Sequence, residues 1–207
     1  MSELVDDFAS PEVLTSDVAF EGKVWNIRRD RFVLDGDEIV REYTDHPGAV
    51  AVLALDERDR VLLIKQYRHP VEMRDWELPA GLLDIRDESP LAAAQRELAE
   101  EADLVAESWS LLAEFMTSPG GSNEVLRVYL ARGVSAAPVV FDRTEEEAGI
   151  EVRWVSLDEV VDGVLARQLQ NSILAIAALS AAAGQQRGWS TLGDPKAPWP
   201  RHPLERR

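Results

Sequence analysis

Hydrophobic and polar positions alternate in short runs through the first part of the chain. Between Val18 and Tyr43, apolar residues alternate with charged ones in the way that half-buried strands require. Asp35-Gly36-Asp37 separates two of these runs and is typical of a hairpin turn. The pattern predicts a small antiparallel β region over residues 1–45.

The apolar runs become longer after His46-Pro47-Gly48, which we interpret as the junction to a main domain over residues 46–190. Ser89 followed by Pro90 is a favourable helix start, because serine caps the first turn and proline suits its first position. The last residues, 191–207, are rich in proline and predict an irregular tail. The strands expected in the main domain are Ala49–Leu55, Val61–Tyr67, Trp109–Phe115, Glu124–Ala131 and Ile150–Val155, and the helices are 90–102, Leu157–Leu165 and Asn171–Ala183. Because the strands cluster, the class is α+β or a three-layer sandwich.

The composition of the chain limits the cellular compartment and the classes of partner that we expect. The chain has 207 residues, no cysteine and a formal net charge of −16, without an apolar run long enough to span a membrane or a signal peptide at its start. We therefore expect a cytoplasmic protein that binds neither nucleic acid nor membrane, since both are anionic. An anionic substrate would need cations between its phosphates and the acidic protein.

One predicted helix carries three acidic residues that can face one site. Glu97 and Glu101 lie four positions apart, and Glu97 and Glu100 lie three positions apart. Residues at these two spacings share one face of a helix. Clustered carboxylates repel one another, and bound Mg²⁺, which prefers oxygen ligands and bridges to phosphates, would reverse that repulsion. The alternative interpretation is an ordinary solvated helical face.

The residues around this helix resemble the Nudix box. The matching positions, in order, are Gly81, Glu88, Arg96, Glu97, Leu98, Glu100, Glu101 and Leu104. Six residues rather than five separate Gly81 from Glu88, and Asp103 replaces the final glycine of the pattern. Aspartate tolerates the left-handed conformation expected at that helix exit better than most residues do, and neither change touches the glutamates.

The resemblance implies a fold and a metal site. The fold would be the Nudix α/β/α sandwich with a mixed sheet, and the small N-terminal antiparallel β domain would precede it. The carbonyl of Ala80 and the carboxylates of Glu97 and Glu101 would hold magnesium, with Glu100 assisting. Arg96 would orient the glutamates. Two or three Mg²⁺ ions per active site are implied, with Mn²⁺ as an alternative.

Segments outside the box are similar to ADP-ribose pyrophosphatases of this superfamily. Pro119 in the loop Ser118–Glu124 lies 15 residues after Leu104, and the segments Lys65–Pro70 and Glu77–Gly81 also resemble that subfamily. The implied reaction is hydrolysis of ADP-ribose to AMP and ribose 5-phosphate by water that the metal activates.

The same resemblance assigns substrate contacts outside the metal site. Arg68 and Arg41 match positions that contact the diphosphate or the adenine end, and Glu124 matches an acid on the substrate side. Trp25 lies near an aromatic residue that stacks on adenine in relatives. A tryptophan in a strand is as readily explained as part of the core.

The reaction also needs a base for the attacking water. His46, His69 and His202 all lie beside prolines and are poor candidates. The family pattern favours Glu146 in the acidic loop before Ile150, with Glu145 and Glu147 as alternatives.

Relatives exchange the N-terminal strands across a homodimer, so the resemblance implies a homodimer with composite active sites. Two other functions remain open from the sequence. A GDP-mannose or other nucleotide-sugar pyrophosphatase would keep the chemistry and change the leaving group. A Nudix-like ligand sensor without catalysis would not need the intact glutamates.

Overall fold

The computed structural model describes residues 4–139 and 149–202. The chain forms two compact units. The first runs to His46 and includes the loop Ser118–Glu124, and the second comprises Pro47–Thr117 and the chain from Val125 onward.

The first unit is built on an antiparallel sheet of three strands, β1 (Glu12–Phe20), β2 (Asn26–Leu34) and β3 (Asp37–Asp45), in that order. Asp35 (φ +54°) and Gly36 (φ +91°) form the turn between β2 and β3, which confirms the predicted hairpin. Most of β1 was not predicted, because its residues are exposed throughout and carry no burial pattern.

The second unit contains a mixed four-stranded sheet in the order β7 (Ala80–Leu82), β4 (Ala49–Ala54), β9 (Val125–Ala136), β8 (Leu104–Met116). Strands β4 and β9 are parallel, and the other pairs are antiparallel. A second sheet has the order β10 (Glu151–Ser156), β5 (Arg60–Arg68), β6 (Met73–Glu77), and a short 3₁₀ helix, His69–Val71, follows β5.

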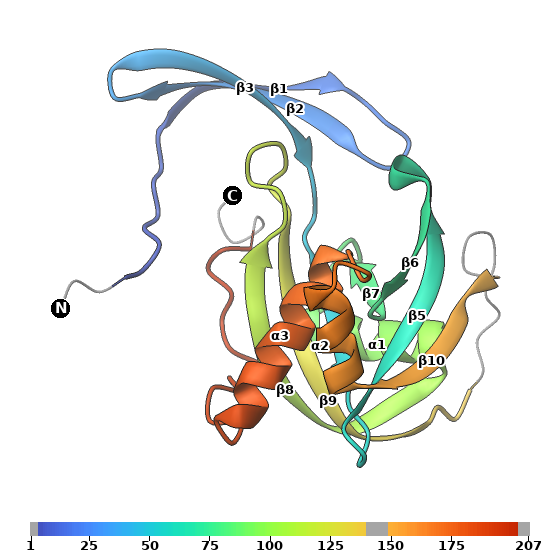
Figure 1. The fold of residues 1–207 in the computed structure, drawn as a ribbon. Helices are drawn as coiled ribbons and strands as arrows, with labels where there is room; N and C mark the ends of the chain where they lie inside the picture. The colour runs from blue at the N-terminus through green and yellow to red at the C-terminus, as the bar shows by residue number, and fades with distance from the viewer. Residues whose placement is uncertain (1–3, 140–148, 203–207) are drawn as a thin grey trace. The chain divides into compact units, whose positions relative to one another are not determined.

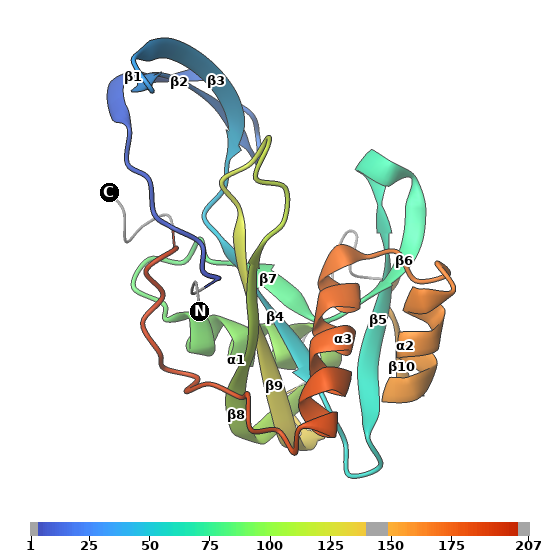
Figure 2. The same cartoon turned by 60° about the vertical axis from the view of Figure 1, so that its left-hand side comes forward.

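Three helices complete this unit: α1 (Pro90–Ala102), α2 (Leu157–Leu165) and α3 (Ser172–Gln186). All six residues of strand β4 are buried. Since alternate residues of a strand point to opposite sides of a sheet, both faces of β4 are covered. Val50 and Val52 pack in a cluster with α1, whereas Ala51 and Leu53 pack in a cluster with α2 and α3. Figures 1 and 2 show α1 on one side of the four-stranded sheet and α3 on the other. The predicted α/β/α sandwich with a mixed sheet is confirmed.

Some elements differ from their predicted extent. Strands β6 and β7 were not predicted, because β6 is short and charged and Pro79 interrupts the apolar run before β7. Strand β8 starts at Leu104 rather than near Trp109, directly after α1. Within the described ranges, no helix is both long and apolar enough to cross a membrane.

Candidate active site

Helix α1 is fixed at both ends by local chemistry that its sequence supplies. The hydroxyl of Ser89 accepts a hydrogen bond from the amide of Ala92 (3.2 Å), and Pro90 occupies the first helical position. The helix ends at Asp103, which adopts the left-handed conformation (φ +54°, ψ +36°) that the sequence predicted at this exit. The orientation of the glutamates on α1 is therefore set by a well-defined helix.

Two glutamates of α1 meet the short strand β7. The Oε2 atom of Glu101 accepts a hydrogen bond from the amide of Ala80 at 2.9 Å, and Glu101 is only 5% exposed. The carboxylate of Glu97 lies against the α-carbon of Gly81, so closely that a β-carbon at Gly81 would overlap it. Glycine is thus required here for close approach, and both carboxylates converge on adjacent residues of one strand.

Arg96 connects three glutamates of the box. It binds Glu88 through two hydrogen bonds of 3.0 Å each, from Nε and Nη2. Its Nη1 donates to Glu97 (2.6 Å) and to Glu100 (2.9 Å). These carboxylates raise the pKa of Arg96, with the bonds to Glu88 as the largest cause. One guanidinium thus offsets the repulsion among three carboxylates and orients them.

Arg68, at the end of β5, is held by a residue that the sequence did not single out. Its Nε and Nη2 atoms donate to the two oxygens of Glu77 at 2.8 and 2.6 Å, and Glu77 is 4% exposed. The bond to Glu77 raises the pKa of Arg68, and the charge of Glu101 adds to this effect. Glu77 stands directly before Leu78-Pro79 in the segment that resembles the subfamily, but only its hydrogen bonds to Arg68 in the folded chain reveal its role.

The donor set around β7 suits a hard divalent cation, because it consists of carboxylate and backbone oxygens. Glu97 and Glu101 reach the strand that carries the Ala80 carbonyl, and Glu100 lies one position before Glu101 on the same helix. In the part of the chain that the structure describes, no three acidic or histidine side chains converge at metal-binding distances. The oxygen donors suit magnesium by their chemistry, with two carboxylates and one backbone carbonyl rather than three acidic side chains at the site in this described part of the chain.

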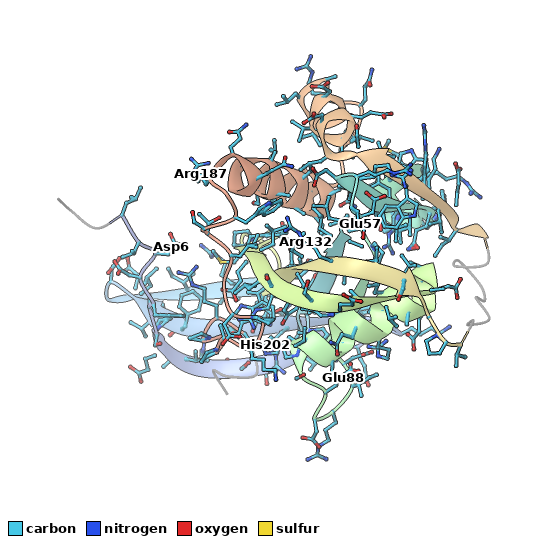
Figure 3. All side chains as sticks on the ribbon, turned by 90° about the horizontal axis from the view of Figure 1, so that it is seen from below. Asp6, Glu57, Glu88, Arg132, Arg187 and His202 are labelled. Carbon is cyan, nitrogen blue, oxygen red and sulfur yellow. The ribbon has the colours of Figure 1, made fainter. Side chains whose placement is uncertain are left out.

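A cavity of about 600 Å³ lies beside the box. The loop after β7 lines one side of it, including Leu83 and Glu88, and the C-terminal residues Pro198, Trp199 and His202 line another. Figure 3 labels Glu88 and His202 in this part of the second unit. The carboxylate of Glu88 therefore adjoins both Arg96 and this cavity.

The first unit brings together two of the expected substrate contacts through a histidine. The rings of Trp25 and His46 stack, with centroids 4.4 Å apart, and Nε2 of His46 lies 3.5 Å from Oε1 of Glu124. Asn123 accepts a hydrogen bond from the amide of His46 (2.7 Å). Arg41 does not join this cluster, since it is exposed on β3 and donates to the carbonyl of Val40. The sequence does not predict the stacking of His46 on Trp25 or its pairing with Glu124.

The expected base, Glu146, and its alternatives Glu145 and Glu147 lie outside the described residues.

Comparison with known proteins bears on this site. The NUDIX domain model matches residues 45–175. The chain is 38% identical over 186 residues to an ADP-ribose pyrophosphatase of Mycobacterium tuberculosis, which covers 87% of this chain and 89% of the relative. It is 34% identical over 167 residues to an ADP-ribose pyrophosphatase of Bacillus subtilis, covering 80% of this chain and 89% of the relative.

A solved structure described as an ADP compounds hydrolase shares the fold. It superposes with a TM-score of 0.71 over 90% of this chain and 99% of its own length, at 19% identity. The family match spans more than half of the chain and includes every residue of the carboxylate network on β7 and α1. The chain therefore belongs to the Nudix family and is a Nudix hydrolase.

Proposed function

We propose that this chain hydrolyses the diphosphate of ADP-ribose to AMP and ribose 5-phosphate in a reaction that depends on Mg²⁺. The observation that carries the proposal is the convergence of the Glu97 and Glu101 carboxylates on Ala80 and Gly81. The names of the two relatives, both ADP-ribose pyrophosphatases, support ADP-ribose as the substrate.

In this proposal the carbonyl of Ala80 and the carboxylates of Glu97 and Glu101 hold the metal, and Glu100 assists. Bound Mg²⁺, with Mn²⁺ as an alternative and two or three ions per site, neutralises the diphosphate and lowers the pKa of a bound water. Arg96 keeps Glu97 and Glu100 oriented through its short hydrogen bonds. The chain thereby presents several oriented carboxylates before substrate arrives.

The remaining residues act on the substrate. Arg68, paired with a buried carboxylate and 42% exposed in its side chain, is placed to contact the diphosphate. Trp25 offers a ring face to the adenine, and Arg41 and Glu124 contribute polar contacts. Glu146 takes the proton of the attacking water. Trp25 is half-buried and stacked on one side by His46, an arrangement that supports a ring held in a fixed plane.

The test is a hydrolysis assay with purified protein and Mg²⁺ on ADP-ribose, GDP-mannose, UDP-glucose and NADH. We expect selective release of AMP from ADP-ribose. Glu97→Gln removes one charge from the site and should lose at least about a hundredfold in kcat/KM, since it removes a metal ligand. Glu57→Gln removes the same charge in an exposed turn and should leave activity unchanged.

The outcomes separate the alternatives. Turnover of GDP-mannose in place of ADP-ribose would retain the metal site and reject the proposed substrate. Equal activity of Glu97→Gln and Glu57→Gln would reject the metal site itself. Binding of nucleotide without any turnover would favour a ligand sensor.

We also propose that the active form is a homodimer with composite active sites, as the resemblance implies. Mass photometry gives the oligomeric state directly. Mixing inactive Glu97→Gln with inactive Trp25→Ala protein tests whether two chains build one site, because only composite sites would regain activity in mixed dimers. Composite sites restore part of the wild-type rate, whereas sites confined to one chain leave the mixture inactive.

A further inference from the structure

We propose that the C-terminal segment, Ala197–His202, positions strand β7 and thereby the metal-binding carboxylates. This inference rests on the proposed function, because it treats β7 as one wall of the metal site. It assigns a role to a proline-rich stretch that forms no helix or strand in residues 194–202.

The first contact is the anchor of the segment on Arg127. This arginine of β9 is 2% exposed, and Glu114 of β8 accepts hydrogen bonds from its Nε (2.8 Å) and its Nη2. Its remaining donors bind the carbonyls of Ala197 (3.0 Å) and Pro198 (3.2 Å). A buried guanidinium costs folding free energy unless its N–H groups are hydrogen-bonded. The carbonyls of the segment supply acceptors for Arg127, and the same bonds hold the segment in place.

The second contact is Trp199, which joins the segment to the core. Its ring packs over the guanidinium of Arg127, with 4.6 Å between Cζ and the ring centroid. Trp199 is 6% exposed and belongs to the cluster that contains Leu83, after β7, and Leu98 of α1. Trp199 therefore lies in the same buried cluster as the glutamate-bearing helix and the residue that follows β7.

The third contact is His202, which closes the chain of contacts on Gly48. Its amide donates to the carbonyl of Trp199 (2.9 Å), and its ring lies so near Gly48 that an ideal β-carbon there would be 2.8 Å from Nε2. The carbonyl of Gly48 in turn accepts from the amide of Leu83 (3.0 Å). That bond adjoins the register pairs Ala49–Leu82 and Val50–Gly81, so the segment supports the end of the β4–β7 ladder.

The cavity of about 600 Å³ explains why this support matters. It lies between the C-terminal segment and the loop that runs from Leu83 to Glu88, so part of that loop faces space rather than packed core. Figure 2 shows the chain after α3 returning past β8 toward this side of the unit. Since β7 has only three residues and pairs with β4 alone, its position depends on contacts at its ends.

The experiment measures metal binding without substrate. We expect Trp199→Ala to weaken Mn²⁺ binding to the full-length protein by about tenfold, the scale for residues that orient metal ligands. Free Mn²⁺ is measured by electron paramagnetic resonance, and kcat/KM for ADP-ribose is measured alongside. Trp199→Phe keeps an aromatic ring over Arg127 and should bind Mn²⁺ close to the wild-type level. His202→Ala removes the ring that packs on Gly48, should also weaken binding, and serves if Trp199→Ala does not fold.

The control is a core variant outside this chain of contacts. Val160→Ala in α2 removes buried apolar volume and should lower the melting temperature without changing Mn²⁺ binding. If Trp199→Ala and His202→Ala lower the melting temperature but bind Mn²⁺ as Val160→Ala does, the segment only stabilises the fold and the inference is wrong. Failure of the wild-type protein to bind Mn²⁺ would instead reject the proposed function.

Discussion

The carboxylate of Glu101 and the backbone amide of Ala80, 21 positions apart in the sequence, are joined by a hydrogen bond of 2.9 Å. The bond fixes where the end of α1 meets β7, and it leaves the second oxygen of Glu101 oriented by the strand. The hydrogen bond therefore links the helix to the strand at the residues that we propose as metal ligands.

The neighbouring glycine gives the first prediction. Gly81→Ala places a methyl group where the carboxylate of Glu97 lies, and that carboxylate must move away from β7. We expect kcat/KM to fall by at least about a hundredfold, because a ligand displaced by about 1 Å no longer fits the reacting geometry. The measurement is steady-state hydrolysis of ADP-ribose, with circular dichroism to confirm that the variant folds.

A methyl group added elsewhere is the matched control for Gly81→Ala. Gly184 lies inside α3, where the nearest atom to an added β-carbon is 3.3 Å away on Trp189. Alanine is the better helix former, so Gly184→Ala should retain activity and most of its stability. Equal activity of the two variants would show that close packing of Glu97 on Gly81 has no catalytic importance.

The ion pair between Arg68 and Glu77 predicts that losing the arginine alone destabilises the protein more than losing both charges. Arg68→Ala leaves the buried carboxylate of Glu77 without its bidentate partner and should cost about 1–3 kcal/mol in the free energy of unfolding. The lower part of that range applies because Arg68 is partly exposed. Adding Glu77→Gln to Arg68→Ala removes the uncompensated charge and should restore part of the loss. Urea unfolding of the wild type, both single variants and the double variant gives the coupling energy, and simple additivity would contradict the pairing.

The helix and its glutamates could be predicted from the sequence because their determinants are local. Ser89, Pro90 and Asp103 mark the two ends of α1 through the conformations that each residue prefers. The spacing of Glu97 and Glu101 follows from helical geometry alone. The buried strand β4 was likewise visible, since its apolar residues are continuous.

The partners of those residues could not be predicted, because they depend on pairing between distant segments. Strand β7 is too short to show a period, and it exists only because β4 pairs with it. The pairing of β5 with β6 places Glu77 opposite Ile64, and the long side chain of Arg68 reaches it from farther along β5. Trp199 is buried although it lies between two prolines in a segment that composition marks as irregular.

His46 predicts a pH dependence of stability. Burial lowers the pKa of His46 below its ordinary value of about 6.5, although the carboxylate of Glu124 acts in the opposite direction. The folded protein therefore binds this proton less readily than the unfolded chain does. This contribution to stability is fully present above about pH 6.5 and is lost as the pH falls toward the lowered pKa.

The measurement for His46 is urea unfolding at about pH 7.5 and about pH 5.5, together with an NMR titration of the imidazole. His46→Gln removes the titrating group, so its stability should fall less than that of the wild type between these values. The difference between the two proteins, rather than either value alone, isolates the histidine from the many carboxylates. A wild-type imidazole that titrates above its ordinary pKa would reverse the sign and contradict the prediction.

Asp103 predicts a stabilising substitution at a position where the chain departs from the family pattern. It adopts a left-handed conformation at the end of α1, with its amide donating to the carbonyl of Ala99 (3.0 Å). A residue with a β-carbon is strained in this left-handed conformation, whereas glycine is not. Asp103→Gly should therefore raise the free energy of unfolding by about 0.5–1 kcal/mol. Asp103→Ala keeps the strain but loses the polar side chain that tolerates it, and should lower stability by about 1 kcal/mol. Thermal and urea unfolding of the wild type and the two variants establish the order of stability. The backbone bond to Ala99 is the same in all three proteins. An alanine variant more stable than the wild type would therefore mean that conformational strain at Asp103 does not control stability here.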